Sequence, residues 1–146
     1  MAMEKEGYRV THLPVDREGL LKLADLENGI TGETAIVSLM WANNETGVLF
    51  PVKEIAEICQ SRGVLFHCDA VQAAGKIEID VRNVQADYLS LTGHKFHAPK
   101  GIGALYVRRK VPFLPFVHGR RIISDLPMTK KHSSSPSKKM QGQNMD

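Results

Sequence analysis

Residues 51–69 read PVKEIAEICQSRGVLFHCD, in which a helix pattern is followed at once by a strand pattern. The apolar residues of the first part recur at helical spacing, at Val52, Ile55, Ala56 and Cys59. Proline suits the first turn of a helix, and Gly63 favours its end. The run that follows the glycine is apolar and of strand length, as expected for a strand covered on both faces. The stretch therefore predicts a helix over 51–62 and a buried strand over 64–68.

The same alternation continues on both sides of this stretch. Further strand patterns occupy residues 8–13, 34–41, 88–92 and 103–108. Further helix patterns occupy residues 19–26, with Asp16 as a possible cap, and a single turn at 80–84. Strands that alternate with helices are typical of an α/β fold. We therefore expect a mostly parallel sheet with helices on both faces.

Polar residues follow three of the predicted strands at the point where each strand ends. The clusters span residues 42–47, 67–72 and 90–95. In open parallel sheets this edge is where ligands bind. Asp69 and Lys95 are the two groups that pyridoxal 5'-phosphate requires, a carboxylate for its pyridine nitrogen and an amine for its aldehyde. The pair points to a pyridoxal 5'-phosphate site.

With these motifs in this order, the chain resembles the pyridoxal-phosphate-dependent cysteine desulfurases of the nitrogen-fixation and iron–sulfur-assembly type, in the class V aminotransferase group. The resemblance runs from about Glu6 to Gly119. It is densest in three segments: 42–47, 67–76 and 89–107. Residues 94–101, which read HKFHAPKG, are most similar to the nitrogen-fixation branch. The resemblance implies that residues 1–119 are part of the large domain of a fold-type-I pyridoxal-phosphate-dependent transferase.

The resemblance assigns Lys95 as the residue that holds the cofactor as a Schiff base, and Asp69 as the partner of the pyridine nitrogen. Each has a simpler alternative. Most lysines are solvated surface charges, and Asp69 is also placed to cap a helix that begins at Ala70. The two roles of Asp69 are compatible, because a backbone N–H and a cofactor nitrogen can use different carboxylate oxygens.

Four further residues complete the implied cofactor-binding set: Asn44 and Gln72 at the phenolic oxygen of the ring, Thr92 and His94 near the phosphate. Hydroxyl and imidazole groups suit an oxyanion. The alternatives are that the segment from Asn43 to Gly47 is only a turn and that Gln72 is an exposed helix residue.

The resemblance also implies an activity: removal of sulfur from L-cysteine for iron–sulfur cluster assembly, which leaves L-alanine. The family members are cytoplasmic homodimers that pass sulfur to an iron–sulfur scaffold protein. The alternatives are a non-catalytic remnant and another class V enzyme such as selenocysteine lyase.

The chain departs from the family pattern at both ends. The phosphate-binding loop and the ring-stacking histidine would precede Met1, and the family pattern is lost at Arg120. The mobile-loop cysteine and the substrate-binding arginine would lie further on. We expect a truncated chain that is inactive alone, and the change after Gly119 is the kind that a frameshift or a fusion produces.

The two cysteines are predicted to be structural. Cys59 lies on the apolar helix face and Cys68 in the apolar run before Asp69, whereas a reactive thiolate needs an exposed, electropositive place. Unpaired cysteines fit a reducing compartment. A zinc site built from Cys68, His94 and His97 lacks the usual paired ligands, so we expect no metal.

Positive charge is concentrated near the C-terminus. Six of the 19 basic and two of the 16 acidic residues lie in 120–146, so this segment carries +4 and residues 1–119 carry −1. A near-neutral body is no surface for nucleic acid, and no apolar run approaches the ~20 residues of a membrane span. We expect residues 120–146 to form a divergent basic tail that is disordered from about residue 129.

Overall fold

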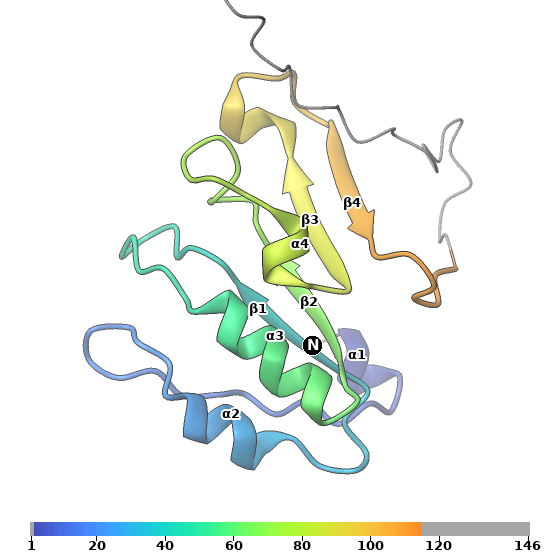
Figure 1. Ribbon diagram of the computed structural model, residues 1–146. Helices are drawn as coiled ribbons and strands as arrows, with labels where there is room; N and C mark the ends of the chain where they lie inside the picture. Colours follow the sequence, from blue (N-terminus) through green and yellow to red (C-terminus); the bar gives the residue numbers. More distant parts are fainter. Residues whose placement is uncertain (1, 115–146) are drawn as a thin grey trace, which may run out of the picture. The chain divides into compact units, whose positions relative to one another are not determined.

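The computed structural model of the chain describes residues 2–114 (Figure 1). Its elements are α1 (Ala2–Lys5), α2 (Leu23–Gly29), β1 (Ile36–Met40), α3 (Val52–Ser61), β2 (Leu65–Asp69), α4 (Val81–Val84), β3 (Tyr88–Thr92), the 3-10 turn η1 (Gly93–Phe96) and β4 (Gly103–Val107). The strands form one sheet in the order β1-β2-β3-β4. Strands β1, β2 and β3 run parallel, and β4 is antiparallel to β3. The predicted α/β fold with a mostly parallel sheet is confirmed.

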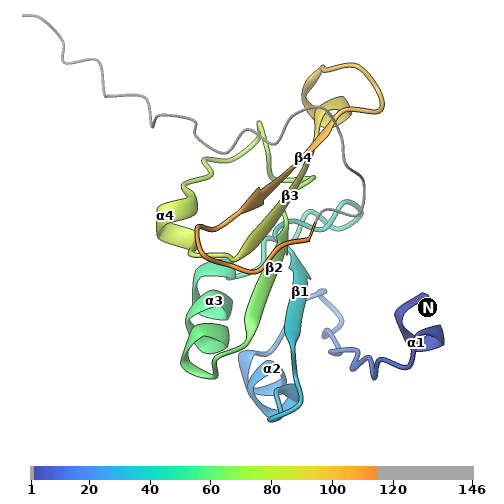
Figure 2. The same ribbon diagram turned by 90° about the vertical axis from the view of Figure 1, so that its right-hand side faces the viewer.

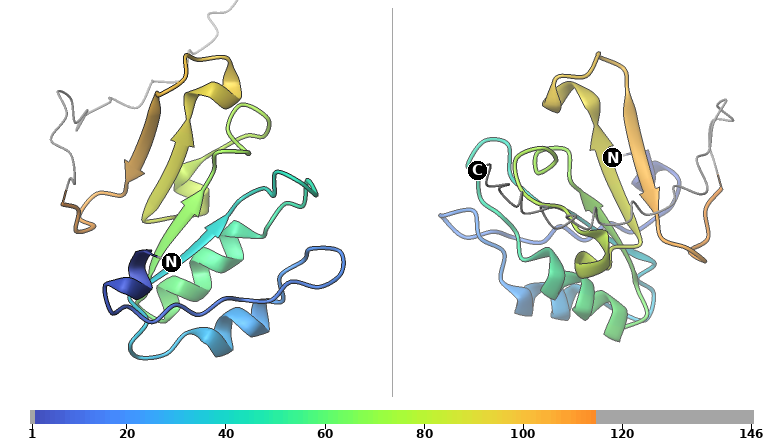
Figure 3. Two further views of the ribbon diagram at one scale, coloured as in Figure 1. Left: turned by 180° about the vertical axis from the view of Figure 1, so that it is seen from behind. Right: turned by 45° about the horizontal axis from the view of Figure 1, so that its top comes forward.

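Helix α3 supplies much of the core. Its apolar stripe is buried, with Ile55 fully enclosed, and it belongs to the same hydrophobic cluster as Phe66 of β2 and Leu89 of β3. The helix predicted over 51–62 is confirmed but is one residue shorter at each end, with Pro51 and Arg62 in the capping positions. Figure 2 shows α3 and α4 on one side of the sheet and the short α1 on the other, and the view from behind in Figure 3 agrees.

The sheet face opposite α3 carries polar side chains. Successive residues of a strand point to opposite faces, so the neighbours of the buried Phe66 and Cys68 point away from α3. In register across β1, β2 and β3, the polar residues on this face are Ser38, His67, Asp69 and Ser90. Asp69 is the last residue of β2, so its carboxylate lies at the edge of the sheet.

Two elements near the N-terminus differ from the sequence-based prediction. Residues 8–13, predicted as a strand, form no strand. The helix predicted over 19–26 is displaced, because α2 spans Leu23–Gly29. Asp16 does not cap this helix: its Oδ1 accepts hydrogen bonds from the backbone N–H groups of Glu18 and Leu20, each at 2.9 Å. The aspartate therefore closes a tight turn, and the helix begins only after it.

A buried ion pair holds the amino-terminal end of β3. Asp87 is 4% exposed and pairs with Arg108, which directly follows β4. The second carboxylate oxygen of Asp87 accepts the backbone N–H of Phe66 at 2.8 Å. One side chain thus links β2, β3 and the end of β4, at the sheet edge away from Asp69.

By its internal contacts the chain divides into residues 1–113 and 114–146. The boundary predicted at Gly119 and the tail predicted over 120–146 lie outside the described residues. Within residues 2–114, no helix is both long and apolar enough to cross a membrane.

Candidate functional site

The three polar clusters leave the sheet at one edge. The backbone N–H of Trp41 donates to the carbonyl of Asp69 at 2.8 Å, and that of Ala70 donates to the carbonyl of Ser90 at 3.0 Å. The segments that follow β1, β2 and β3 therefore begin side by side, as expected for parallel strands. This edge is the place where the candidate residues can act together.

Asp69 ends β2 with one of its two carboxylate oxygens engaged in a hydrogen bond. Its Oδ1 accepts the backbone N–H of Val71 at 2.9 Å, the capping bond that was the simpler alternative for this residue. The segment that follows is a series of turns rather than a regular helix. Within the described residues, Oδ2 makes no hydrogen bond and the carboxylate forms no ion pair. One oxygen thus holds the local turn, and the other is available to a ligand.

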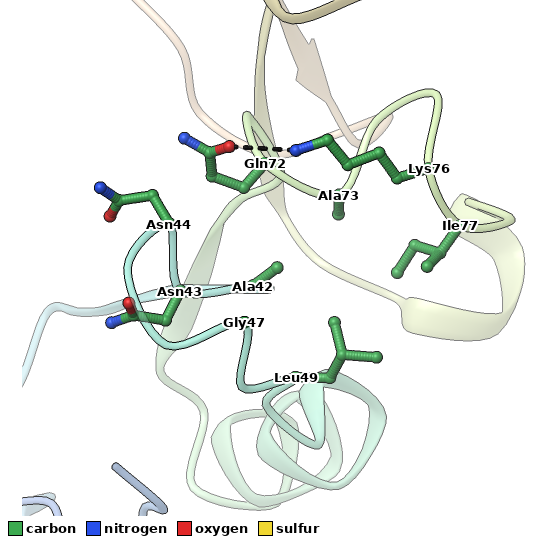
Figure 4. A pocket seen from close by; sticks show the side chains of 9 residues that line it. All are labelled: Ala42, Asn43, Asn44, Gly47, Leu49, Gln72, Ala73, Lys76 and Ile77. Atoms are coloured by element: carbon green, nitrogen blue, oxygen red, sulfur yellow. Dashed lines mark hydrogen bonds between the residues drawn. The ribbon is translucent and has the colours of Figure 1, made fainter.

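A pocket of about 230 Å³ brings Asn44 and Gln72 together (Figure 4). It is lined by Ala42, Asn43, Asn44, Gly47, Leu49, Gln72, Ala73, Lys76 and Ile77. The Lys76 ammonium group donates to Gln72 Oε1 at 3.3 Å, and the amide nitrogen of Gln72 is turned away from Lys76 (Figure 4). Gln72 therefore presents a donor to the side of the pocket on which Asn44 lies. Sequence reasoning missed Lys76, although its position four residues after Gln72 was a signal.

Asn43 and Asn44 have different tasks. Asn43 Oδ1 accepts the backbone N–H groups of Glu45 at 2.8 Å and Thr46 at 3.0 Å, so this side chain holds a turn. Gly47 completes the turn with a φ of 73°, a conformation that glycine adopts at little cost. The turn alternative is thus correct for Asn43, while Asn44 is exposed and lines the pocket.

Lys95 is carried by the turn η1 directly after β3. Its side chain is exposed, like that of His94, whose Nδ1 lies 2.9 Å from Thr92 Oγ1. A Cβ atom added to Gly93 would lie 2.8 Å from the Cβ of Ala98, so only glycine fits this close approach. The predicted residues of this segment lie at the same edge of the sheet as Asp69, but they do not line the pocket that holds Asn44 and Gln72.

Sequence reasoning also missed a hydrogen-bonded line next to Asp69. The His67 ring lies between the hydroxyls of Ser38 and Ser90, with its Nδ1 2.7 Å from Ser38 Oγ and its Nε2 2.6 Å from Ser90 Oγ. Burial lowers the pKa of His67 below its usual 6.5, and the nearby Asp69 carboxylate acts in the opposite direction.

The prediction that both cysteines are buried is confirmed. Burial raises the pKa of Cys59 to about 11 and that of Cys68 to about 12, in each case with a smaller contribution from a nearby aspartate. Both thiols are therefore protonated near neutral pH and are poor nucleophiles. Within residues 2–114, no three His, Cys, Asp or Glu side chains are grouped so that they could hold a metal ion.

The chain matches a known protein family over nearly its whole length. The model of the family described as "Aminotransferase class-V" matches residues 1–143. The chain belongs to the class-V aminotransferase family. This class-V chain is 50% identical, over 117 residues, to the cysteine desulfurase IscS of Clostridium botulinum, covering 80% of its own length and 30% of that relative. It is 53% identical to cysteine desulfurase 2 of Trichormus variabilis, and the match covers 80% of this chain and 29% of that relative.

Solved structures of similar proteins show the same fold. A "NifS-like protein" matches this class-V chain with a TM-score of 0.77 and 41% identity, covering 81% of this chain and 33% of the other. A structure described as "SspA in complex with cysteine" matches with a TM-score of 0.77 and 37% identity, and the match covers 82% of this chain and 35% of the other. The resemblance to cysteine desulfurases inferred from the motifs is confirmed. The class-V chain spans about 30% of the length of the curated relatives that it matches.

Proposed function

We propose that this chain provides the cofactor-binding part of a pyridoxal-phosphate-dependent cysteine desulfurase, which takes sulfur from L-cysteine and leaves L-alanine. The observation that carries the proposal is that Asp69 ends β2 and Lys95 follows the neighbouring parallel strand β3 at the same edge of the sheet. The similarity to cysteine desulfurases, at about 50% identity, supports it. A homodimer, an iron–sulfur scaffold protein as sulfur acceptor and a cytoplasmic location belong to the same proposal.

The residues at this edge fit the cofactor by their chemistry. The available Oδ2 of Asp69 suits a protonated pyridine nitrogen, because a carboxylate is an acceptor that stabilises a nearby cation. The amide of Gln72, turned to present its nitrogen, and that of Asn44 suit the phenolic oxygen. Thr92 and His94 offer a hydroxyl and an imidazole for the phosphate.

When bound, pyridoxal phosphate supplies an electron sink for the carbon that becomes negatively charged in the substrate. The chain's residues bind and orient it. Lys95 offers an exposed amine for covalent attachment and can afterwards carry a proton to or from the substrate carbon. With the cofactor bound, the Asp69 carboxylate would favour the protonated form of its pyridine nitrogen. Cys59 and Cys68 take no part as nucleophiles, because both are buried and protonated.

The test is to locate the cofactor on the chain. Purified protein is mixed with pyridoxal phosphate, reduced with borohydride and analysed by peptide mass spectrometry. We expect the added mass on Lys95, and we expect it to be lost in Lys95→Ala. Lys100→Ala is the matched control, because Lys100 is an exposed lysine of the same connection between β3 and β4. Equal modification of Lys95 and Lys100 would show surface labelling instead of a site.

A second measurement tests the substrate. Addition of L-cysteine should change the visible absorbance of the cofactor-loaded chain differently from that of free pyridoxal phosphate, because a site that recognises the substrate alters its reaction with the cofactor. Equal changes in the loaded chain and in free pyridoxal phosphate would leave only a pyridoxal-phosphate-binding fragment without recognition of cysteine.

A further inference from the structure

A line of three side chains crosses the sheet one step before the edge that carries Asp69. It consists of Ser38 in β1, His67 in β2 and Ser90 in β3, joined by contacts of 2.7 and 2.6 Å. Ser38 and His67 are register partners. Ser90 is the register partner of Asp69, the next residue on this face of β2. The imidazole and the carboxylate are therefore neighbours on one face.

Both ring nitrogens of His67 are engaged, so the orientation of the ring is fixed. A neutral imidazole has one donor and one acceptor nitrogen, and a serine hydroxyl can serve either. All three side chains can therefore be hydrogen-bonded while the His67 ring is neutral. From β1 and β3, His67 faces the uncharged hydroxyl residues Ser38 and Ser90 and its register partner Tyr88, and Asp69 is the charged group that acts on it.

The charge of His67 matters because a positively charged imidazole ring and the cofactor's pyridine nitrogen would both interact with the Asp69 carboxylate. An imidazolium at this position would attract the Asp69 carboxylate and repel a second cation that approaches it. A neutral imidazole leaves the full negative charge of Asp69 to a cation arriving at its available Oδ2. Half-burial of the His67 ring favours the neutral form.

We propose that His67 is a positioning residue: held between Ser38 and Ser90 as a neutral, oriented imidazole, it keeps the Asp69 carboxylate available to the pyridine nitrogen of pyridoxal phosphate. This role rests on the proposed function, and it concerns a residue that does not itself touch the cofactor. Two kinds of experiment separate it from a purely structural role.

The first experiment changes the charge of His67 and measures the affinity of the chain for pyridoxal phosphate by absorbance. His67→Gln keeps a neutral donor and acceptor, so we expect an affinity within about threefold of the unchanged chain. His67→Lys places a permanent cation beside Asp69, so we expect at least about tenfold weaker binding, as for other close like-charge pairs. His12→Lys, at an exposed position of the N-terminal segment, is the charge-matched control and should bind normally.

The second experiment observes His67 without cofactor, and its deciding measurement uses the unchanged chain, so that measurement does not depend on the folding of any variant. Nitrogen-15 spectra of the side chain should show a single neutral tautomer that becomes protonated only below pH 6.5. Ser38→Ala and Ser90→Ala should each convert it to a mixture of tautomers. A mixture or a midpoint at or above 6.5 in the unchanged chain overturns the proposal, whatever the cofactor does.

The outcomes also separate this inference from the proposed function. If the unchanged chain binds pyridoxal phosphate at Lys95 and the Gln and Lys variants bind it equally well, His67 has no positioning role while the proposed function stands. If the unchanged chain takes up no pyridoxal phosphate, the proposed function fails, and the role of His67 toward the cofactor fails with it.

Discussion

At the scale of single residues, two close contacts determine the path of the turn that carries Lys95 and the orientation of the Gln72 amide. Gly93 leaves no room for a side chain where the turn η1 meets Ala98. Lys76 holds the oxygen of the Gln72 amide, so that the nitrogen is directed away from it. Each contact acts on a neighbouring member of the candidate set, Lys95 in the first case and Gln72 in the second.

Replacing Gly93 by alanine should displace the turn that carries Lys95. The added Cβ would lie 2.8 Å from the Ala98 Cβ, so the turn must shift, with a cost of about 1–3 kcal/mol for such overpacking. We expect a lower unfolding midpoint and less attachment of pyridoxal phosphate. Gly32→Ala is the matched control, because nothing lies within 4 Å of the added atom there. Equal behaviour of the two variants would contradict this account of Gly93.

Replacing Lys76 by methionine should weaken cofactor binding slightly and leave folding unchanged. The variant keeps the apolar part of the side chain and removes one exposed hydrogen bond to Gln72, worth about 0.5–1 kcal/mol, or roughly a two- to fivefold change in affinity. Absorbance titration with pyridoxal phosphate measures the effect. Lys53→Met, on the exposed side of α3, should leave the affinity unchanged. An unaltered affinity in Lys76→Met would show that Gln72 orients itself.

At the scale of the elements, the sheet is held at its two ends by different means. The edge with Asp69 is joined by backbone hydrogen bonds and turns. The opposite end depends on the carboxylate of Asp87, which contacts Arg108 and the backbone of Phe66. The contacts of Asp87 therefore stabilise the end of the sheet that lies away from the proposed site.

Asp87→Ala should destabilise the chain strongly without changing the proposed site. It leaves the Phe66 N–H without its acceptor and Arg108 without its partner, and breaking such a buried pair costs about 3–5 kcal/mol, less here because the Arg108 side chain is 35% exposed. Urea unfolding measures the loss. Asp80→Ala, which breaks an exposed pair with Arg82 and the capping bond to the Arg82 backbone N–H, is the comparison and should cost less. A similar loss of unfolding free energy in both variants would mean that the burial of Asp87 does not make its contacts more stabilising than exposed ones.

At the scale of the whole molecule, stability should depend on pH in two separate windows. Because burial lowers the pKa of His67, the unfolded chain binds this proton at a higher pH than the folded chain. The free energy of unfolding therefore falls as the pH drops from 6.5 toward the folded pKa. The Arg82 side-chain hydrogen bond lowers the pKa of Asp80, so stability from that pair is lost only below pH 3.8, as the pH passes through the folded value.

Thermal unfolding of the chain and of His67→Gln, followed by circular dichroism from about pH 8 to about pH 3, separates the two windows. The glutamine variant cannot take up the proton, so its unfolding temperature should stay nearly level where that of the unchanged chain declines. Both proteins should decline together in the acidic window. A parallel decline of both below 6.5 would assign the first window to another group.

The sequence predicted those features that depend on neighbouring residues. The bounds of β3 agree with the prediction, and α3 was read from its apolar stripe and flanking residues. Features that depend on strand pairing were not foreseen, such as the antiparallel direction of β4. The contacts of His67 with Ser38 and Ser90 join residues 29 and 23 positions apart, and they exist only in one register of the strands.

The antiparallel β4 has a consequence for the order in which the site is assembled during folding. Thr92 and Gly103, which close the ladder around the turn of Lys95, are 11 positions apart, whereas β1 and β2 pair across 29 positions and β2 and β3 across 21. Short-range pairings cost less chain entropy and form sooner. The lysine's turn should therefore form early, and the edge that presents Asp69 late. Capture of the cofactor by both residues would then report that the entire sheet has been completed.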